Sequence, residues 1–199
     1  MKANVLQSVF FIFILGSTLF FSSCKEDDKI EPDIPNEEEV ITTLKYTLVN
    51  NADVNDTAIF ILKDLDGDGG ASIAGELFII DSLKAGATYN GSIEFLNETN
   101  PNAIDTITAE VEDEGTEHEI FYDLLNMNNS TVTKTDTDSN GNPLGLKTTL
   151  VVQSSPIVNL GIINIVLKHE PKKPNNNTVT DAGGETDKSV VFTSIKTYL

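Results

Sequence analysis

The chain has 199 residues with 13 basic and 31 acidic side chains, a formal net charge of −18, and every basic residue is a lysine. This charge argues against nucleic acid as a partner, because binding it requires a basic face that neutralises phosphates. The sequence has neither arginine nor tryptophan, which removes the bidentate phosphate clamp and the best stacking surface for bases or sugars. Cations are the natural counterpart of such a surface.

The first 24 residues have the pattern of an export signal. Lys2 precedes the apolar run Val9–Phe21, which suits a secretory signal peptide and is too short for a membrane-spanning helix. The residues Phe21-Ser22-Ser23-Cys24 resemble the bacterial lipobox, in which the cysteine becomes the lipidated N-terminus of the mature protein. The resemblance implies lipidation of Cys24, and it explains why an exported chain has a single cysteine.

An acidic segment follows the cysteine. Residues 25–39 combine many carboxylates with two prolines and few apolar side chains, so they cannot bury enough surface to fold. Lys25-Glu26-Asp27-Asp28 resembles the acidic export signal of Bacteroidota lipoproteins, which implies an outer-membrane location and exposure at the cell surface. We predict a lipoprotein signal peptide at 1–23, a flexible tether with lipidated Cys24 at 24–39, and one folded domain at 40–199.

From Val40 onward, short β-rich segments alternate with clusters of Gly, Asn, Asp and Pro. The expected strands are 44–48, 57–63, 76–81, 88–97, 117–124, 146–153, 160–168 and 189–198. At most one short helix is expected, at 106–114, with Asp105 as its cap and Gly115 as its stop. The pattern predicts an all-β fold, a single enlarged antiparallel β-sandwich of the immunoglobulin or fibronectin type.

One turn resembles a known structural motif. The segment from Leu83 to Tyr89, followed by Ile93 and Phe95, is similar to the fibronectin type III tyrosine corner. In such a corner the ring packs in the core and the hydroxyl bonds back to the chain upstream, so we expect Tyr89 to be structural.

Several segments together resemble a family of Bacteroidota (Flavobacterium-type) surface lipoproteins. These are the acidic tether and the segments 64–69, 83–98, 117–122, 136–143 and 168–171. The resemblance implies an export route and a lipid anchor, and it implies no particular reaction.

Two acidic loops match the first half of a calcium-binding loop, in which alternate carboxylates converge on one ion and a glycine permits a sharp turn. The candidate ligands are Asp64, Asp66 and Asp68 in the first loop and Asp136, Asp138 and Asn140 in the second. The bidentate glutamate of an EF-hand is missing from position twelve of both loops. Calcium is the one cofactor that the sequence predicts; the alternative is an Asx-rich turn whose side chains cap their own backbone.

His118 and His169 are the two histidines of the chain. Each continues the inward-facing positions of a predicted strand, so they could meet at one rim of the sandwich with Glu117, Glu119 or Glu170 nearby. They lack the helical spacing of zinc proteases. The plain interpretation is that the two histidines lie at the rim and hydrogen-bond to the backbone or to carboxylates. The alternative is that both histidines are metal ligands.

The sequence carries no signature of nucleophilic catalysis, because G-x-S-x-G is missing and the one cysteine is assigned to the lipid. We therefore expect no enzyme, but a lipid-anchored, calcium-stabilised binding or structural module at the outer membrane. One alternative is a β-barrel-like lipoprotein that binds a small ligand or lipid, and another is a hydrolase with paired carboxylates. A third is an accessory subunit of a surface complex that docks through an exposed edge strand, for which 189–198 is the candidate.

Overall fold

The structure is a computed structural model that describes residues 40–64, 77–127, 129–155 and 160–199. Contacts between residues group the described residues into one compact unit. Cys24, the tether, Asp66 and Asp68 lie outside the described residues, so lipidation and the first calcium loop stay predictions. No helix in the described ranges is both long enough and apolar enough to cross a membrane.

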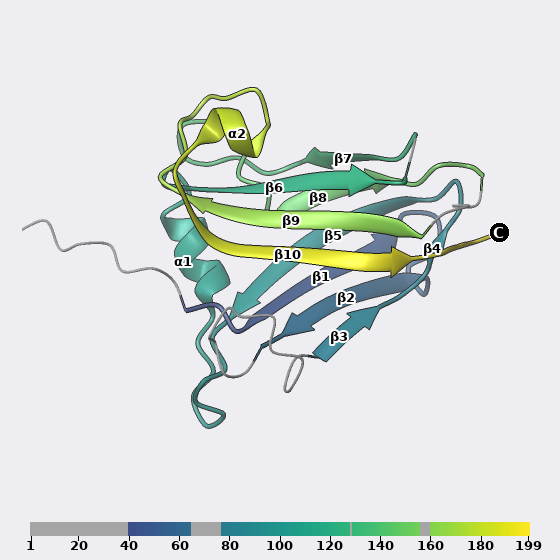
Figure 1. Cartoon of the computed structure of the whole chain (residues 1–199), viewed down its shortest axis with the longest axis horizontal. Coiled ribbons are helices and arrows are strands. Elements are labelled where there is room, and N and C mark those ends of the chain that lie inside the picture. Colours follow the sequence, from purple (N-terminus) through teal and green to yellow (C-terminus); the bar gives the residue numbers. More distant parts are fainter. Residues whose placement is uncertain (1–39, 65–76, 128, 156–159) are drawn as a thin grey trace, which may run out of the picture. The chain divides into compact units, whose positions relative to one another are not determined.

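The larger sheet has six strands in the order β3-β2-β1-β5-β8-β7, all antiparallel to their neighbours (Figure 1). Its strands are β1 (Thr43–Asn50), β2 (Thr57–Lys63), β3 (Leu77–Ile80), β5 (Thr88–Leu96), β7 (Thr131–Lys134) and β8 (Lys147–Val151). In β1, Leu44, Tyr46 and Leu48 are buried and the residues between them are half-buried. This alternation fixes which face of the sheet meets the core, because successive side chains of a strand point to opposite faces.

A three-stranded antiparallel sheet in the order β10-β9-β6 lies across one face of the larger sheet (Figure 1). Its strands are β6 (His118–Leu125), β9 (Gly161–His169) and β10 (Glu185–Ile195). Aromatic rings join the two sheets: Tyr46 of β1 meets Tyr122 of β6 at 5.6 Å between ring centroids, and Phe60 of β2 meets Phe192 of β10 at 5.7 Å. The predicted all-β, antiparallel, sandwich-like fold is confirmed.

A small third sheet holds the C-terminus. Strand β4 (Leu83–Lys84) pairs in parallel with β11 (Thr197–Tyr198). The strand expected at 189–198 is therefore divided, because β10 begins earlier, at Glu185, and ends at Ile195. The short strand β7 was not expected, since four residues are too few to establish an alternation.

The structure has two short helices in its described part, α1 (Ile107–Asp113) and α2 (Val179–Ala182). Helix α1 is the one expected at 106–114, but Thr106 takes the N-cap position, and Asp105 instead accepts a hydrogen bond from the backbone N–H of Thr106. The expectation of at most one helix is wrong, since α2 forms within a polar loop, where the Thr178 side chain accepts from the N–H of Asp181. One helical turn is too short to show helical periodicity in the sequence.

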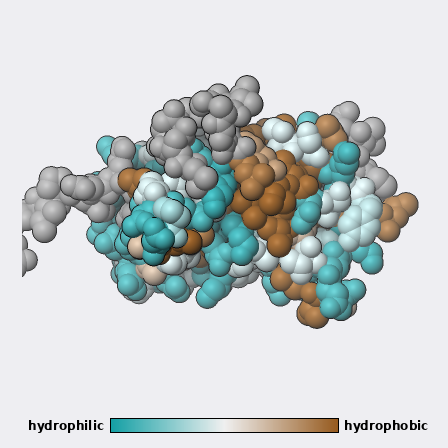
Figure 2. All heavy atoms as spheres, turned by 90° about the horizontal axis from the view of Figure 1, so that it is seen from below, coloured by the Kyte–Doolittle hydropathy of each residue, from teal (hydrophilic) through white to brown (hydrophobic). Residues whose placement is uncertain are grey.

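An apolar patch lies at the edge of the larger sheet. Leu77, Phe78 and Ile79 of β3 are consecutive and are 50%, 46% and 38% exposed. Figure 2 shows apolar side chains gathered on the side of the molecule where β3 lies. We call these three residues the β3 patch.

Candidate metal centre

The two histidines meet in the three-stranded sheet. Strand β9 is the central strand, and its last residue, His169, is the register partner of His118, the first residue of β6. The imidazole rings stack with their centroids 4.8 Å apart and their planes 20° from parallel. Both residues are buried, as expected from their inward-facing positions on the two strands.

A carboxylate reaches the same point from the third strand. In the pairing of β10 with β9, Thr186 faces Lys168 and Lys188 faces Leu167, so Asp187 is the extra residue of a β-bulge. A bulge changes the direction of a side chain locally. The side chain of Asp187 points inward and is 0% exposed, beside the two rings.

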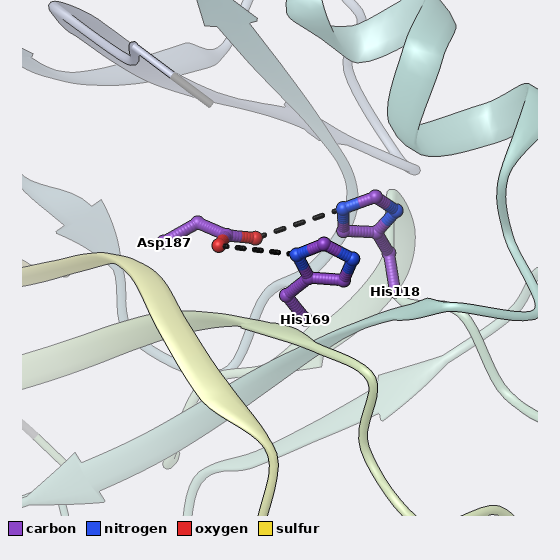
Figure 3. Close-up of side chains that lie close together, drawn as sticks. All are labelled: His118, His169 and Asp187. Atoms are coloured by element: carbon purple, nitrogen blue, oxygen red, sulfur yellow. Dashed lines mark ion pairs between the residues drawn. The ribbon is translucent and has the colours of Figure 1, made fainter. Parts of the chain in front are cut away.

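The three side chains converge on a small volume (Figure 3). Nε2 of His118 lies 3.6 Å from Oδ2 of Asp187, and Nδ1 of His169 lies 3.8 Å from Oδ1 of the same carboxylate. One potential ligand atom from each residue lies within 4.8 Å of the others. Nδ1 of His118 is 3.4 Å from the carbonyl oxygen of Glu114. Burial lowers the pKa of His118, and the adjacent His169 lowers it further.

This set of atoms suits a metal with a preference for nitrogen. Two imidazoles and one carboxylate are ligands of zinc and of related divalent transition metals. Calcium takes six to eight oxygen ligands, so two imidazoles fit it poorly. Without a metal, the same groups would form a set of imidazole–carboxylate contacts inside the sheet.

The carboxylate at the histidines is not one of those suggested by the sequence. Glu119 points away from the pair: it accepts hydrogen bonds from Lys134 at 2.5 Å and from Asn175 at 2.7 Å. The residues Glu117 and Glu170 are exposed. Sequence reasoning missed Asp187 because its inward direction depends on the bulge, which breaks the alternation of the strand.

The second acidic loop is closed by donors of the protein itself. Oδ1 of Asp138 accepts from the backbone N–H groups of Asn140 and Asn142 at 2.9 Å each, and Oδ2 accepts from Nζ of Lys173 at 3.1 Å. Desolvation raises the pKa of Asp138, but hydrogen bonds from Asn142 and Lys173 more than offset it and hold the pKa below its ordinary value. Asp136 accepts from the N–H of Gly145 at 2.8 Å.

This loop therefore has the geometry of the Asx-rich alternative. Asn140 is exposed, and the ammonium of Lys173 provides the positive charge that the sequence assigned to calcium. In the first loop only Asp64 is described, and its carboxylate lies 3.7 Å from Nζ of Lys188 on β10. Calcium at either loop stays a prediction, with a lysine beside the described carboxylate in each case.

Tyr89 is placed as a tyrosine corner requires. Its side chain is buried, and its hydroxyl accepts a hydrogen bond from the backbone N–H of Lys84 at 2.8 Å. The same hydroxyl donates to Asp56 at 3.3 Å, and Asp56 also accepts from Tyr198 at 2.8 Å and from Asn50 at 2.7 Å. The corner thus also ties the C-terminal strand β11 to the larger sheet.

No family model, no curated protein and no solved structure matches the chain. The candidate site is therefore assigned from its own geometry: two stacked histidines and one inward aspartate, from three neighbouring strands, around a common point.

Proposed function

We propose that the protein is a lipid-anchored lipoprotein of the outer membrane, displayed at the cell surface, that acts as a non-catalytic binding module. The lipobox-like Phe21-Ser22-Ser23-Cys24, directly after an apolar run, supports the anchor. An extended tether over 25–39 would span about 50 Å, enough to hold the folded unit clear of the membrane surface.

The β3 patch is the observation that supports a binding role best. Within the described part of the chain, strand β3 is an edge strand, paired with β2 on one side. Its sequence, Leu-Phe-Ile-Ile, has neither the charged residues nor the proline that usually protect such an edge. Leu77 and Ile79 lie on one face of the strand and Phe78 on the other, so exposed apolar side chains flank this edge on both faces, which supports an interaction along the edge of a chain whose net charge is −18. The partner that fits is an extended apolar segment of another protein, which would add a strand beside β3.

Two measurements test the anchor. Mass spectrometry of the mature N-terminus should find acyl chains on Cys24, and the Cys24→Ser variant should leave the membrane fraction. Protease added to intact cells should digest the folded unit if it is displayed outside. An unmodified Cys24, or a protein recovered from the soluble periplasm, would contradict the proposal.

The binding surface is tested by a matched pair of charge substitutions. Leu77→Lys alters the β3 patch, and Val191→Lys introduces the same charge on β10 at nearly equal exposure, 50% against 48%. A photo-crosslinking residue placed at position 78 should capture a partner protein in native membranes. When each substitution is combined with this residue, the partner should no longer be captured by Leu77→Lys and should still be captured by Val191→Lys. Equal capture by both variants would show that β3 is not the docking edge.

Calcium belongs to the proposal as a stabilising ion. Its support is the pattern shared by the two acidic loops and the strong negative charge of the chain. Extracellular calcium modules of this kind bind weakly, with Kd of about 10⁻⁴ to 10⁻³ M. The lipid anchor and the β3 patch do not depend on it.

A further inference from the structure

We propose that His118, His169 and Asp187 bind one divalent transition metal ion, with zinc as the best fit, and that this ion fastens both edge strands of the three-stranded sheet to its central strand. The proposal is independent of the lipid anchor and of the β3 patch. It assigns a metal site to a cluster that the proposed function does not use.

The distances between the three ligand groups are close to those that a tetrahedral ion needs. With bonds of about 2.0–2.1 Å, the ligand atoms of a tetrahedral zinc lie about 3.3 Å from one another. The two nitrogen–oxygen distances to Asp187 are 3.6 and 3.8 Å, and the largest separation in the set is at most 4.8 Å. Small side-chain rotations would therefore complete three of the four bonds, and a water molecule suits the fourth.

The surroundings of His118 provide an independent reason for an ion. Its side chain is 0% exposed, and Nε2 has no hydrogen-bond partner among the described residues. The ring has an acceptor oxygen on either side, the Glu114 carbonyl near Nδ1 and the Asp187 carboxylate near Nε2. A neutral imidazole has one N–H, so whichever nitrogen carries it, the lone pair of the other faces an oxygen.

A metal ion at Nε2 removes this conflict. Nδ1 of His118 then keeps its proton and donates to Glu114, while Nε2 and the carboxylate of Asp187 both bind the ion. A backbone carbonyl that holds the second nitrogen of a ligating histidine is the usual support of such a site, because it fixes the tautomer and the ring orientation.

The burial of the site indicates a structural ion. The side chains of His118 and Asp187 are 0% exposed and that of His169 is 7% exposed, which leaves little room for a substrate. The three ligands come from β6, β9 and β10, so the ion would link the first residue of β6 and the third residue of β10 to the last residue of β9. Gly184, directly before β10, lies against the backbone of His169: its φ is +66°, and a Cβ added there would lie 2.2 Å from the carbonyl oxygen of His169. Only glycine fits this close approach of the chain to the site.

The test is a metal titration of the full chain in detergent, carrying Cys24→Ser so that its one thiol cannot bind the ion. Zinc competed against a chelator should occupy one site per chain, and cobalt should give the visible absorption of a tetrahedral ion. Asp187→Asn keeps the side-chain volume and should weaken zinc binding about 100-fold or more. Asp123→Asn, an exposed position on β6, makes the same change of charge and should bind as the parent does.

Two readouts need no variant at the site. Zinc at a micromolar concentration stoichiometric with the protein should raise the Tm of the parent chain, and calcium at that concentration, far below its expected Kd of about 10⁻⁴ to 10⁻³ M, should not. Zinc should also shift the imidazole nitrogen resonances of both His118 and His169. If the parent chain shows neither effect, the site is an imidazole–carboxylate cluster without a metal and the proposal is wrong. Equal zinc affinity in a folded Asp187→Asn chain would overturn it as well.

Discussion

Replacing Lys173 with methionine should destabilise the fold, because it removes the cation that neutralises a buried carboxylate. Nζ of Lys173 lies 3.1 Å from Oδ2 of Asp138 and donates to the carbonyl oxygen of Gly115 at 2.6 Å. The side chains of Lys173 and Asp138 are 5% and 0% exposed. Breaking a buried ion pair by removing one partner costs about 3–5 kcal/mol. Backbone N–H groups still bond to Asp138 in the variant, so we expect a loss just below this range, about 2–3 kcal/mol.

Urea unfolding with linear extrapolation measures this loss. The neighbouring Lys172 provides the matched control: its side chain is 68% exposed and lies 3.9 Å from Asp181, so Lys172→Met should change the free energy of unfolding by less than about 0.5 kcal/mol. In the double variant Lys173→Met, Asp138→Asn, part of the stability should return, because no uncompensated charge remains. A loss for Lys173→Met no larger than that for Lys172→Met would refute the ion pair as a stabilising contact.

The same contact predicts a pH dependence with a definite sign. The pKa of Asp138 is lowered in the folded chain, so its contribution to stability is fully present above the unfolded-state pKa of about 3.9. That contribution is lost as the pH falls through the lower, folded value. The difference in stability between the parent chain and Lys173→Met should therefore be largest near neutral pH and should shrink below about pH 3.9. A difference that grows on acidification would contradict this reasoning.

Three further outcomes are expected. Asp56→Ala removes the acceptor that ties β11 to the larger sheet, so it should cost about 1 kcal/mol and speed hydrogen exchange in β11 before that in the core. Gly184→Ala should lower the free energy of unfolding by about 2 kcal/mol or more, because the added Cβ would lie 2.2 Å from a backbone oxygen. Gly183 has a similar φ but open space around its Cβ position, so Gly183→Ala should cost only about 1 kcal/mol. Thermal melts of the two variants measure this difference. Calcium at about 100 times its Kd would raise the free energy of unfolding by about 2.7 kcal/mol. This increase should disappear in Asp66→Asn and persist in Asp138→Asn, because Lys173 already provides a positive charge beside Asp138. Loss of the increase in Asp138→Asn alone would place the ion in the second loop.

Much of the fold follows from period-two alternation along the chain. Buried Leu44, Tyr46 and Leu48 mark one face of β1, and the same parity turns His118 and His169 toward the interior, where the register of β6 and β9 makes them partners. Alternation is a local property, so a single sequence can reveal it.

The features that the sequence did not reveal depend on contacts between distant segments. Asp187 faces the histidines because β10 has an extra residue opposite β9. No local sequence pattern predicts a β-bulge at that position. The pairing of Asp138 with Lys173 joins residues 35 positions apart. The sequence of the acidic loop alone matches a calcium-binding pattern, but it does not show that a distant lysine places a positive charge beside the carboxylate. Helix α2 is a single turn in a polar loop and lacks a periodic signal.

The most direct test of the metal centre is a crystal structure of the full chain grown with zinc, with anomalous scattering recorded at the zinc absorption edge. We expect one strong peak at about 2.0–2.1 Å from Nε2 of His118, a ring nitrogen of His169 and the carboxylate of Asp187. Anomalous density confined to the acidic loops or to surface carboxylates, with the three side chains still in contact and no ion between them, would contradict the proposed site.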